Sequence, residues 1–252
     1  MTSDAAQDLE TYLASGGKLT APDNVPARYR AELLRLMATF IDSELAGAAG
    51  FADLINAAPS LGARIAAARI VMEKLENARR VLAVMGEFGT NTDRYVTAHP
   101  WSDRLPRNAS IGATRAGADM RLSVFHYPVE GWVDAVAMNV VMGEAAKVQL
   151  GEFEGVSYQP LALAFRQIRA VEDTHLELGI AGLQAIIGER GGREAVREAV
   201  AYWRPRVADS FGASDSARFE RLARYGLRRR ENAGLRAEWE RALDATLKAL
   251  GV

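Results

Sequence analysis

The sequence has no cysteine and only three histidines. The absence of cysteine excludes disulfides, zinc–thiolate sites, cysteine-ligated iron–sulfur clusters and cysteine nucleophiles, and the scarcity of histidine argues against a histidine-rich metal site. No charge of one sign dominates, because 31 Lys and Arg stand against 32 Asp and Glu. A protein that binds nucleic acid mainly by neutralising phosphates is normally strongly basic. We therefore expect no nucleic-acid partner.

Long apolar runs are also missing. The most apolar stretch, Val133 to Met142, is short and contains Asp134 and Asn139, whereas a membrane span needs roughly 18 apolar residues. The opening segment MTSDAAQDLETY carries acids where a signal peptide has basic and then apolar residues. We expect a cytoplasmic protein with no membrane association. Its hydrophobic content of 49% is enough for a sizeable core.

The composition favours helices, because Ala, Leu, Glu and Arg dominate and β-branched alternation is scarce. The periodicity predicts four long helices at about 28–49, 61–88, 129–151 and 160–188. Three further helices are predicted at about 192–211, 214–225 and 232–250. Ser60 is a candidate N-cap for the second long helix, and Gly89 is a candidate stop.

Between the second and third long helices, residues 90–128 lose this periodicity and are predicted to hold at most a short helix or strand near 121–125. A ferritin-like four-helix bundle needs such a connection, because the chain must cross the full length of the bundle between its two helical hairpins. A disordered linker is the competing interpretation, but the segment contains aromatic residues that favour packing: Tyr95, Trp101, Phe125 and Tyr127. We predict one all-α, ferritin-like domain over 1–252, with its bundle at about 28–188 and C-terminal helices at about 192–250.

Four polar residues lie on the apolar stripes of the predicted helices, where each demands an explanation. Glu44 lies on the first helix and Glu144 on the third, while Glu172 and His175 stand one turn apart on the fourth. A Glu-x-x-His helix can give a carboxylate and an imidazole to one metal site. These four residues are the candidate metal ligands. By itself, however, a Glu-x-x-His pair is common by chance.

The second helix lacks an obvious ligand. Its apolar stripe turns Lys74 and Asn77 inward, and neither is a normal iron ligand, whereas Glu73 and Glu76 fall off the stripe. A buried lysine is tolerated mainly when it has an acid partner. We therefore expect Lys74 to contact Glu44 or Glu172.

Several short segments share a pattern with one known family. They are Ser43-Glu44, Ala58-Pro59-Ser60-Leu61, Phe125-His126-Tyr127-Pro128 leading to Trp132, Glu172-Asp173-Thr174-His175, and Leu227-Arg228-Arg229-Arg230-Glu231-Asn232 with Leu235-Arg236. From about residue 26 to 250, the sequence resembles the catalytic A subunit family of bacterial phenylacetyl-CoA epoxidase, a multicomponent ferritin-like di-iron oxygenase of phenylacetate catabolism.

The resemblance implies a partly degenerate metal site. Glu44 falls on the family's first-helix ligand, and Glu172 with His175 falls on its fourth-helix Glu-x-x-His. Lys74 and Asn77 fall where the family has a ligand Glu and a ligand His, and the third-helix carboxylate falls on Gly143, next to Glu144. The family's non-catalytic structural subunit, which pairs with the A subunit, lacks ligands in a similar way.

Two main functions stay open at this stage. The first is an iron-binding subunit, with a single iron expected more readily than an intact di-iron centre. For such a subunit the resemblance implies epoxidation of the aromatic ring of a CoA thioester, with O2 and with electrons from a separate reductase. The alternative is a metal-free scaffold subunit without catalysis of its own, and the family fold could also serve another oxidation. The expected partners are other oxygenase subunits or further copies of the chain. The basic run Arg228-Arg229-Arg230 is interpreted as a solvated face, with contact to an anionic ligand or partner as the minor alternative.

Overall fold

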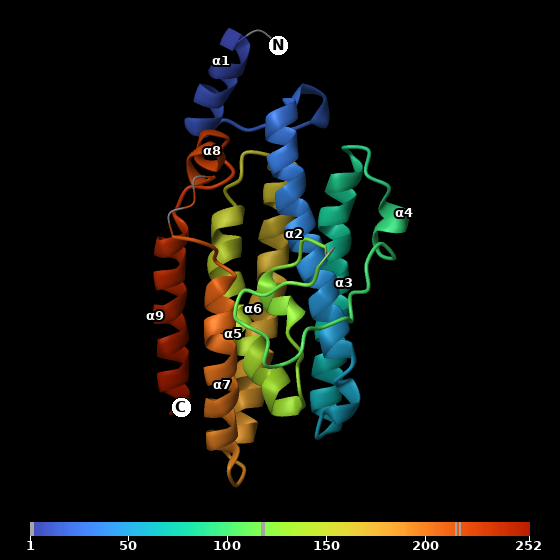
Figure 1. Cartoon of the computed structure of the whole chain (residues 1–252), viewed down its shortest axis with the longest axis vertical. Coiled ribbons are helices and arrows are strands. Elements are labelled where there is room, and N and C mark those ends of the chain that lie inside the picture. The colour runs from blue at the N-terminus through green and yellow to red at the C-terminus, as the bar shows by residue number, and fades with distance from the viewer. Residues whose placement is uncertain (1–2, 117–118, 215, 217) are drawn as a thin grey trace.

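Four long helices form the bundle of this computed structural model, which describes residues 3–116, 119–214, 216 and 218–252 (Figure 1). They are α2 (Ala27–Ala52), α3 (Leu61–Gly86), α5 (Trp132–Phe153) and α6 (Gln159–Ile187). Helix α2 packs on α3, α5 packs on α6, and α3 packs on α6. The predicted all-α, ferritin-like fold is confirmed. None of the helices in the described ranges is long and apolar enough to cross a membrane.

The connection between α3 and α5 crosses the bundle lengthwise, since α3 ends near the top of Figure 1 and α5 begins near the bottom. It contains α4 (Thr92–Tyr95) and the short 3-10 helix η3 (Ser123–His126). Its described residues are packed against α2: the Tyr95 hydroxyl donates to Asp42 Oδ1 at 2.8 Å, and the Leu122 amide donates to Ser43 Oγ at 3.0 Å. This packing agrees with the crossover interpretation and not with a disordered linker.

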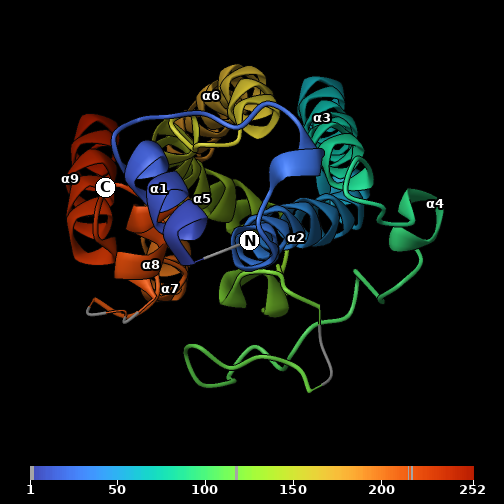
Figure 2. The same ribbon diagram turned by 90° about the horizontal axis from the view of Figure 1, so that it is seen from above.

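The remaining helices cover one side and one end of the bundle. Helices α7 (Gly192–Asp209) and α9 (Asn232–Leu250) pack against α5, and α1 (Ser3–Ala14) contacts α8 (Phe219–Arg224). Two further 3-10 turns are η1 (Pro22–Asn24) and η2 (Ile55–Ala57). Seen from above, α1 lies across one end of the molecule, near α8 (Figure 2).

The predicted helix at 214–225 is wrong at the described residues 214, 216 and 218, which are not helical, and α8 begins at Phe219; residues 215 and 217 lie outside the described part of the chain. Gly212 has a φ of +80°, a left-handed conformation that breaks the helical path after α7 and that glycine adopts readily. The predicted cap at Ser60 is correct, whereas α3 ends at Gly86, two residues before the predicted end. The Ser60 side chain accepts a hydrogen bond from the Ala63 amide at 3.1 Å, and Gly89 has a φ of +85° just beyond α3.

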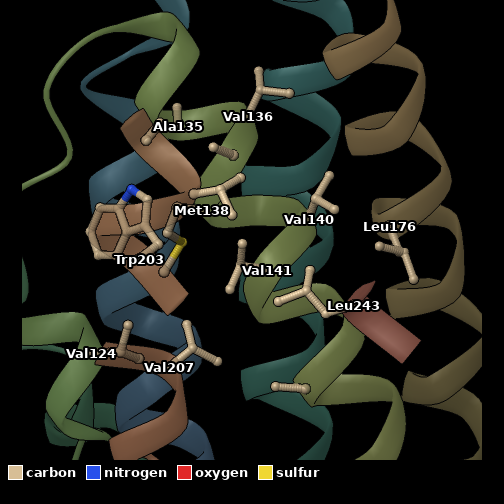
Figure 3. Close-up of a cluster of buried hydrophobic side chains, with 14 of the residues drawn as sticks. Val124, Ala135, Val136, Met138, Val140, Val141, Leu176, Trp203, Val207 and Leu243 are labelled. Atoms are coloured by element: carbon tan, nitrogen blue, oxygen red, sulfur yellow. The ribbon is translucent and has the colours of Figure 1, made fainter. Parts of the chain in front are cut away.

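Helix α5 is the central helix of the larger apolar cluster, with α6, α7 and α9 around it (Figure 3). Trp203 of α7 is fully buried there, and its indole N–H donates to Asp134 Oδ1 at 2.8 Å. A second apolar cluster joins α2, α3 and the first half of α6. Along α3, Ile70 belongs to the first cluster and Ala78 to the second. Lys74 lies between them, so the polar site lies where the two apolar clusters meet.

Candidate functional site

Lys74 lies between two buried carboxylates. Its ammonium nitrogen is 3.2 Å from Glu44 Oε1, and it is 3.1 Å and 3.3 Å from the two oxygens of Glu172. All three residues are buried, with 6% to 8% of their surface exposed. The sequence predicted contact with one of these acids, and the lysine contacts both. It therefore connects α2, α3 and α6 through charge-assisted hydrogen bonds.

Asn77, one turn further along α3, reinforces this bridge. Its side-chain amide nitrogen lies 3.0 Å from Glu172 Oε1 and 3.3 Å from Glu44 Oε2, so it donates to both carboxylates. Its amide oxygen, by contrast, is buried without a hydrogen-bond partner in the described part of the chain. Lys74 and Asn77, the two inward polar residues of α3, therefore both act as hydrogen-bond donors to the carboxylates of Glu44 and Glu172.

His175 extends the cluster to the bundle surface. Its Nδ1 lies 3.2 Å from Glu172 Oε1, and its Nε2 lies 2.8 Å from Glu73 Oε2. An ionised carboxylate only accepts hydrogen bonds, so a hydrogen bond to it requires a hydrogen on the ring nitrogen concerned. Glu73 also pairs with Arg69, at 3.0 Å. The periodicity missed this role of Glu73, because its side chain lies at the edge of the stripe and remains 19% exposed.

Glu144 does not join these residues. It is buried, but its carboxylate accepts a hydrogen bond from Thr246 Oγ1 of α9 at 2.6 Å. Helix α5 is buried on several sides by α6, α7 and α9, so its apolar positions do not single out one face that points into the bundle. The structure therefore brings Glu44, Glu172 and His175 together and places Glu144 against α9.

Position 143, where the resemblance puts the third-helix carboxylate, faces α6. A Cβ atom built on Gly143 would lie 3.2 Å from Leu176 Cδ1 and 3.3 Å from Leu176 Cβ. A side chain at this position would require Leu176 to shift. This tight contact explains a glycine here in terms of helix packing.

The charges of the cluster shift one another's protonation. Burial raises the pKa of Glu44 to about 7, and the negative charge of Glu172 adds to that effect while Lys74 opposes it. Burial also acts to raise the pKa of Glu172, but the Lys74 charge and the His175 hydrogen bond outweigh it and hold that pKa well below its usual range. Burial opposes the charge on Lys74, yet its two acid partners raise its pKa above the ordinary value. The lysine therefore stays charged.

Glu44 should make stability depend on pH. Its folded pKa of about 7 lies above the ordinary 4.5, so its contribution is fully present below pH 4.5 and is lost as the pH rises through 7. Between pH 4.5 and about 7, we expect the free energy of unfolding of the parent to fall relative to that of Glu44→Gln by up to about 1.4 kcal/mol per pH unit. Urea unfolding of both proteins at pH 5, 6, 7 and 8 measures the difference. Glu177→Gln, at an exposed position on α6, is the control. A parent–variant difference that is the same at every pH would contradict this assignment.

A cavity of about 270 Å³ adjoins the cluster. Its inner wall includes the buried residues Glu44, Lys74 and Glu172, and its outer wall includes the exposed Arg35 and the partly exposed Arg218. Most of the wall is apolar and comes from α2, α5, η3 and described residues between positions 210 and 232. No local sequence pattern predicts this cavity, because segments far apart in the chain form it. It connects the molecular surface to the charged cluster.

Comparison with known proteins identifies the family. Residues 9–252 match the family described as phenylacetic acid catabolic protein. The chain belongs to this family. None of the curated proteins compared matches the chain. The match covers nearly the whole chain, including the bundle, the crossover and the C-terminal helices. It confirms, at the level of the family, the resemblance drawn from the short motifs.

The residues present do not fit a di-iron centre. A carboxylate-bridged di-iron site in a ferritin-like bundle takes a Glu from each of two helices and a Glu-x-x-His from each of the other two. In this chain α6 supplies Glu172 and His175, but α3 supplies Lys74 and Asn77, whose N–H groups point at the remaining acids. Among the side chains that the structure describes, no group of three or more His, Asp or Glu could hold a metal ion.

Proposed function

We propose that this chain is a metal-free structural subunit of a cytoplasmic multicomponent oxygenase in phenylacetate catabolism. The observation that carries the proposal is the ammonium group of Lys74 between the carboxylates of Glu44 and Glu172. In a catalytic member of the family, the corresponding space would belong to metal. Here the positive charge is part of the polypeptide, so the bundle does not need a metal ion to hold these acids together.

Charge balance supports the same function. Buried acids without a cation would be costly, because an ionised carboxylate loses most of its hydration on burial. Lys74 supplies a positive charge next to Glu44 and Glu172, and the His175 ring contacts Glu172 and Glu73. Arg69 pairs with Glu73 from the surface. The cluster therefore ties α2, α3 and α6 together as a structural element.

A second candidate is an iron-binding, catalytic subunit that acts on an aromatic CoA thioester. It is favoured by the convergence of Glu44, Glu172 and His175 next to a cavity that reaches the surface. A single metal ion there would require Lys74 to leave its position between the two acids, and Glu144 would have to exchange Thr246 for the metal. The structural subunit requires neither rearrangement.

Reconstitution of the oxygenase distinguishes the two candidates. Purified chain supplied with O2, a reductase and phenylacetyl-CoA is expected to give no epoxidised product. Mixed with a metal-loaded family member from the same organism that carries a complete ligand set, it is expected to form a stable complex in analytical ultracentrifugation, and activity should follow the iron of that partner. Turnover by this chain alone would contradict the proposal.

A further inference from the structure

The cavity beside the charged cluster has an aromatic wall. Five of the eight phenylalanines of the chain line it: Phe40, Phe125, Phe153, Phe211 and Phe219. Its volume of about 270 Å³ lies just below the range of roughly 300–1,000 Å³ that is typical of small-molecule sites. Such sites combine an apolar lining with a few polar groups that fix the ligand's orientation. The wall therefore suits a small molecule with an aromatic or bulky alkyl body.

Arg228 supplies a polar group of this kind. It lines the cavity, its guanidinium lies over the ring of Phe153 at 5.7 Å, and it donates to Gln149 Oε1 at 3.0 Å and Asn232 Oδ1 at 2.9 Å. Both acceptors are neutral amides. Within the described residues, no carboxylate lies within ion-pair distance of this side chain, and burial lowers its pKa. Two of its five N–H donors are used in these bonds, so others remain for a ligand.

The other cations of the cavity wall differ from Arg228. Lys74 bridges Glu44 and Glu172, and Arg218 forms an ion pair with Glu32, which also lines the cavity. Arg35 is exposed to water. Arg228 is therefore the partly buried cation of this wall that makes no direct ion pair within the described residues, although Glu152 acts on its charge from a distance. An anionic group entering the cavity would find it there.

We propose that the cavity binds a small amphipathic monocarboxylate, with its aromatic or alkyl body among the phenylalanines and its carboxylate on the guanidinium of Arg228. A planar carboxylate matches the fork of an arginine, since the two can form parallel hydrogen bonds. The proposal concerns a binding site and does not depend on whether the chain holds a metal ion.

Isothermal titration calorimetry with a matched pair of probes tests the site. We expect the parent to bind 4-phenylbutyrate at least about tenfold more tightly than 4-phenylbutanamide, because hydrogen bonds to charged groups are the stronger ones. Arg228→Gln should remove this preference and leave the affinity for the amide within about threefold. Arg236→Gln is the matched control, because Arg236 is an exposed arginine of α9 that pairs with Glu240. It should keep the preference.

A second variant tests the position of the ligand. Ala146 lines the cavity on α5, and Ala146→Phe should fill it and abolish binding of both probes. Circular dichroism checks that each variant is folded. Equal affinity of the parent for acid and amide, binding of neither at millimolar concentration, a preference that survives Arg228→Gln, or binding that survives Ala146→Phe would each overturn the proposal.

Discussion

Replacing Lys74 with methionine is expected to lower the free energy of unfolding by about 3–5 kcal/mol. Methionine keeps much of the length and the apolar stem of the lysine but removes its charge. Glu44 and Glu172 then remain buried and close together with one cation fewer between them. Breaking a buried ion pair by removing one partner costs this much because the other charge is left without compensation.

Urea unfolding near pH 7.5 measures this loss. Lys147→Met is the matched control: Lys147 is exposed on α5, and its replacement should change stability by no more than about 0.5 kcal/mol. Adding Glu172→Gln to the Lys74→Met protein should recover part of the lost stability, since it removes one of the two stranded acids. If Lys74→Met unfolds at the same urea concentration as the parent, the lysine is not a structural cation.

The fold could be predicted from sequence because its helices are long and most have one apolar stripe. The boundaries of α2, α3 and α6 follow from periodicity, and the cap at Ser60 follows from local chemistry. The long aperiodic connection was compatible with a crossover or with a disordered linker, and its aromatic residues favoured the crossover. The short helix α4 and the amino-terminal helix α1 were missed, and the start of α8 was misplaced.

The site was predictable only where a helix has one buried face. Helix α3 has an exposed side and a buried side, so the stripe correctly turned Lys74 and Asn77 inward. Helix α5 is buried by several neighbours, so the same reasoning could not tell which of them Glu144 faces. The contact of Glu73 with His175 joins residues 102 positions apart on different helices, and no local pattern carries that information.

The cavity was beyond sequence reasoning for a related reason. Its wall combines α2, α5, η3 and a segment near the carboxyl end, and their relative placement is a result of packing. Arg228 belongs to a basic run that was interpreted mainly as a solvated face. Arg229 and Arg230 are exposed as expected, but Arg228 is partly buried and its contacts with Gln149 and Asn232 place it at the cavity.

Restoring the family's ligand pattern on α3 is expected to create a metal site. In Lys74→Glu/Asn77→His, the two inward positions would present a carboxylate and an imidazole toward Glu44, Glu172 and His175. We expect this protein to bind at least about one equivalent of iron and to melt at a higher temperature with iron than without it, because a ligand that binds only the folded state stabilises it. Without metal it should be less stable than the parent, since a third acid then joins the other two.

The matched control for this double variant is Arg79→Glu. Arg79 is an exposed residue of the same helix, so its replacement also exchanges a basic side chain for an acid but leaves the interior of the bundle unchanged. It should gain no iron. Iron binding by Arg79→Glu as strong as that of the double variant would show that the added charge, and not the position inside the bundle, attracts the metal.

The role of Lys74 as the internal cation is tested most directly by the metal content of the parent protein. The chain is expressed in medium supplemented with iron and manganese, purified without chelators, and measured by plasma mass spectrometry beside Lys74→Glu/Asn77→His. If Lys74 stands in for the metal, the parent contains far less than one equivalent of either metal while the double variant is loaded. One or two equivalents of iron or manganese in the parent would contradict this role, because Lys74 could not then lie between Glu44 and Glu172.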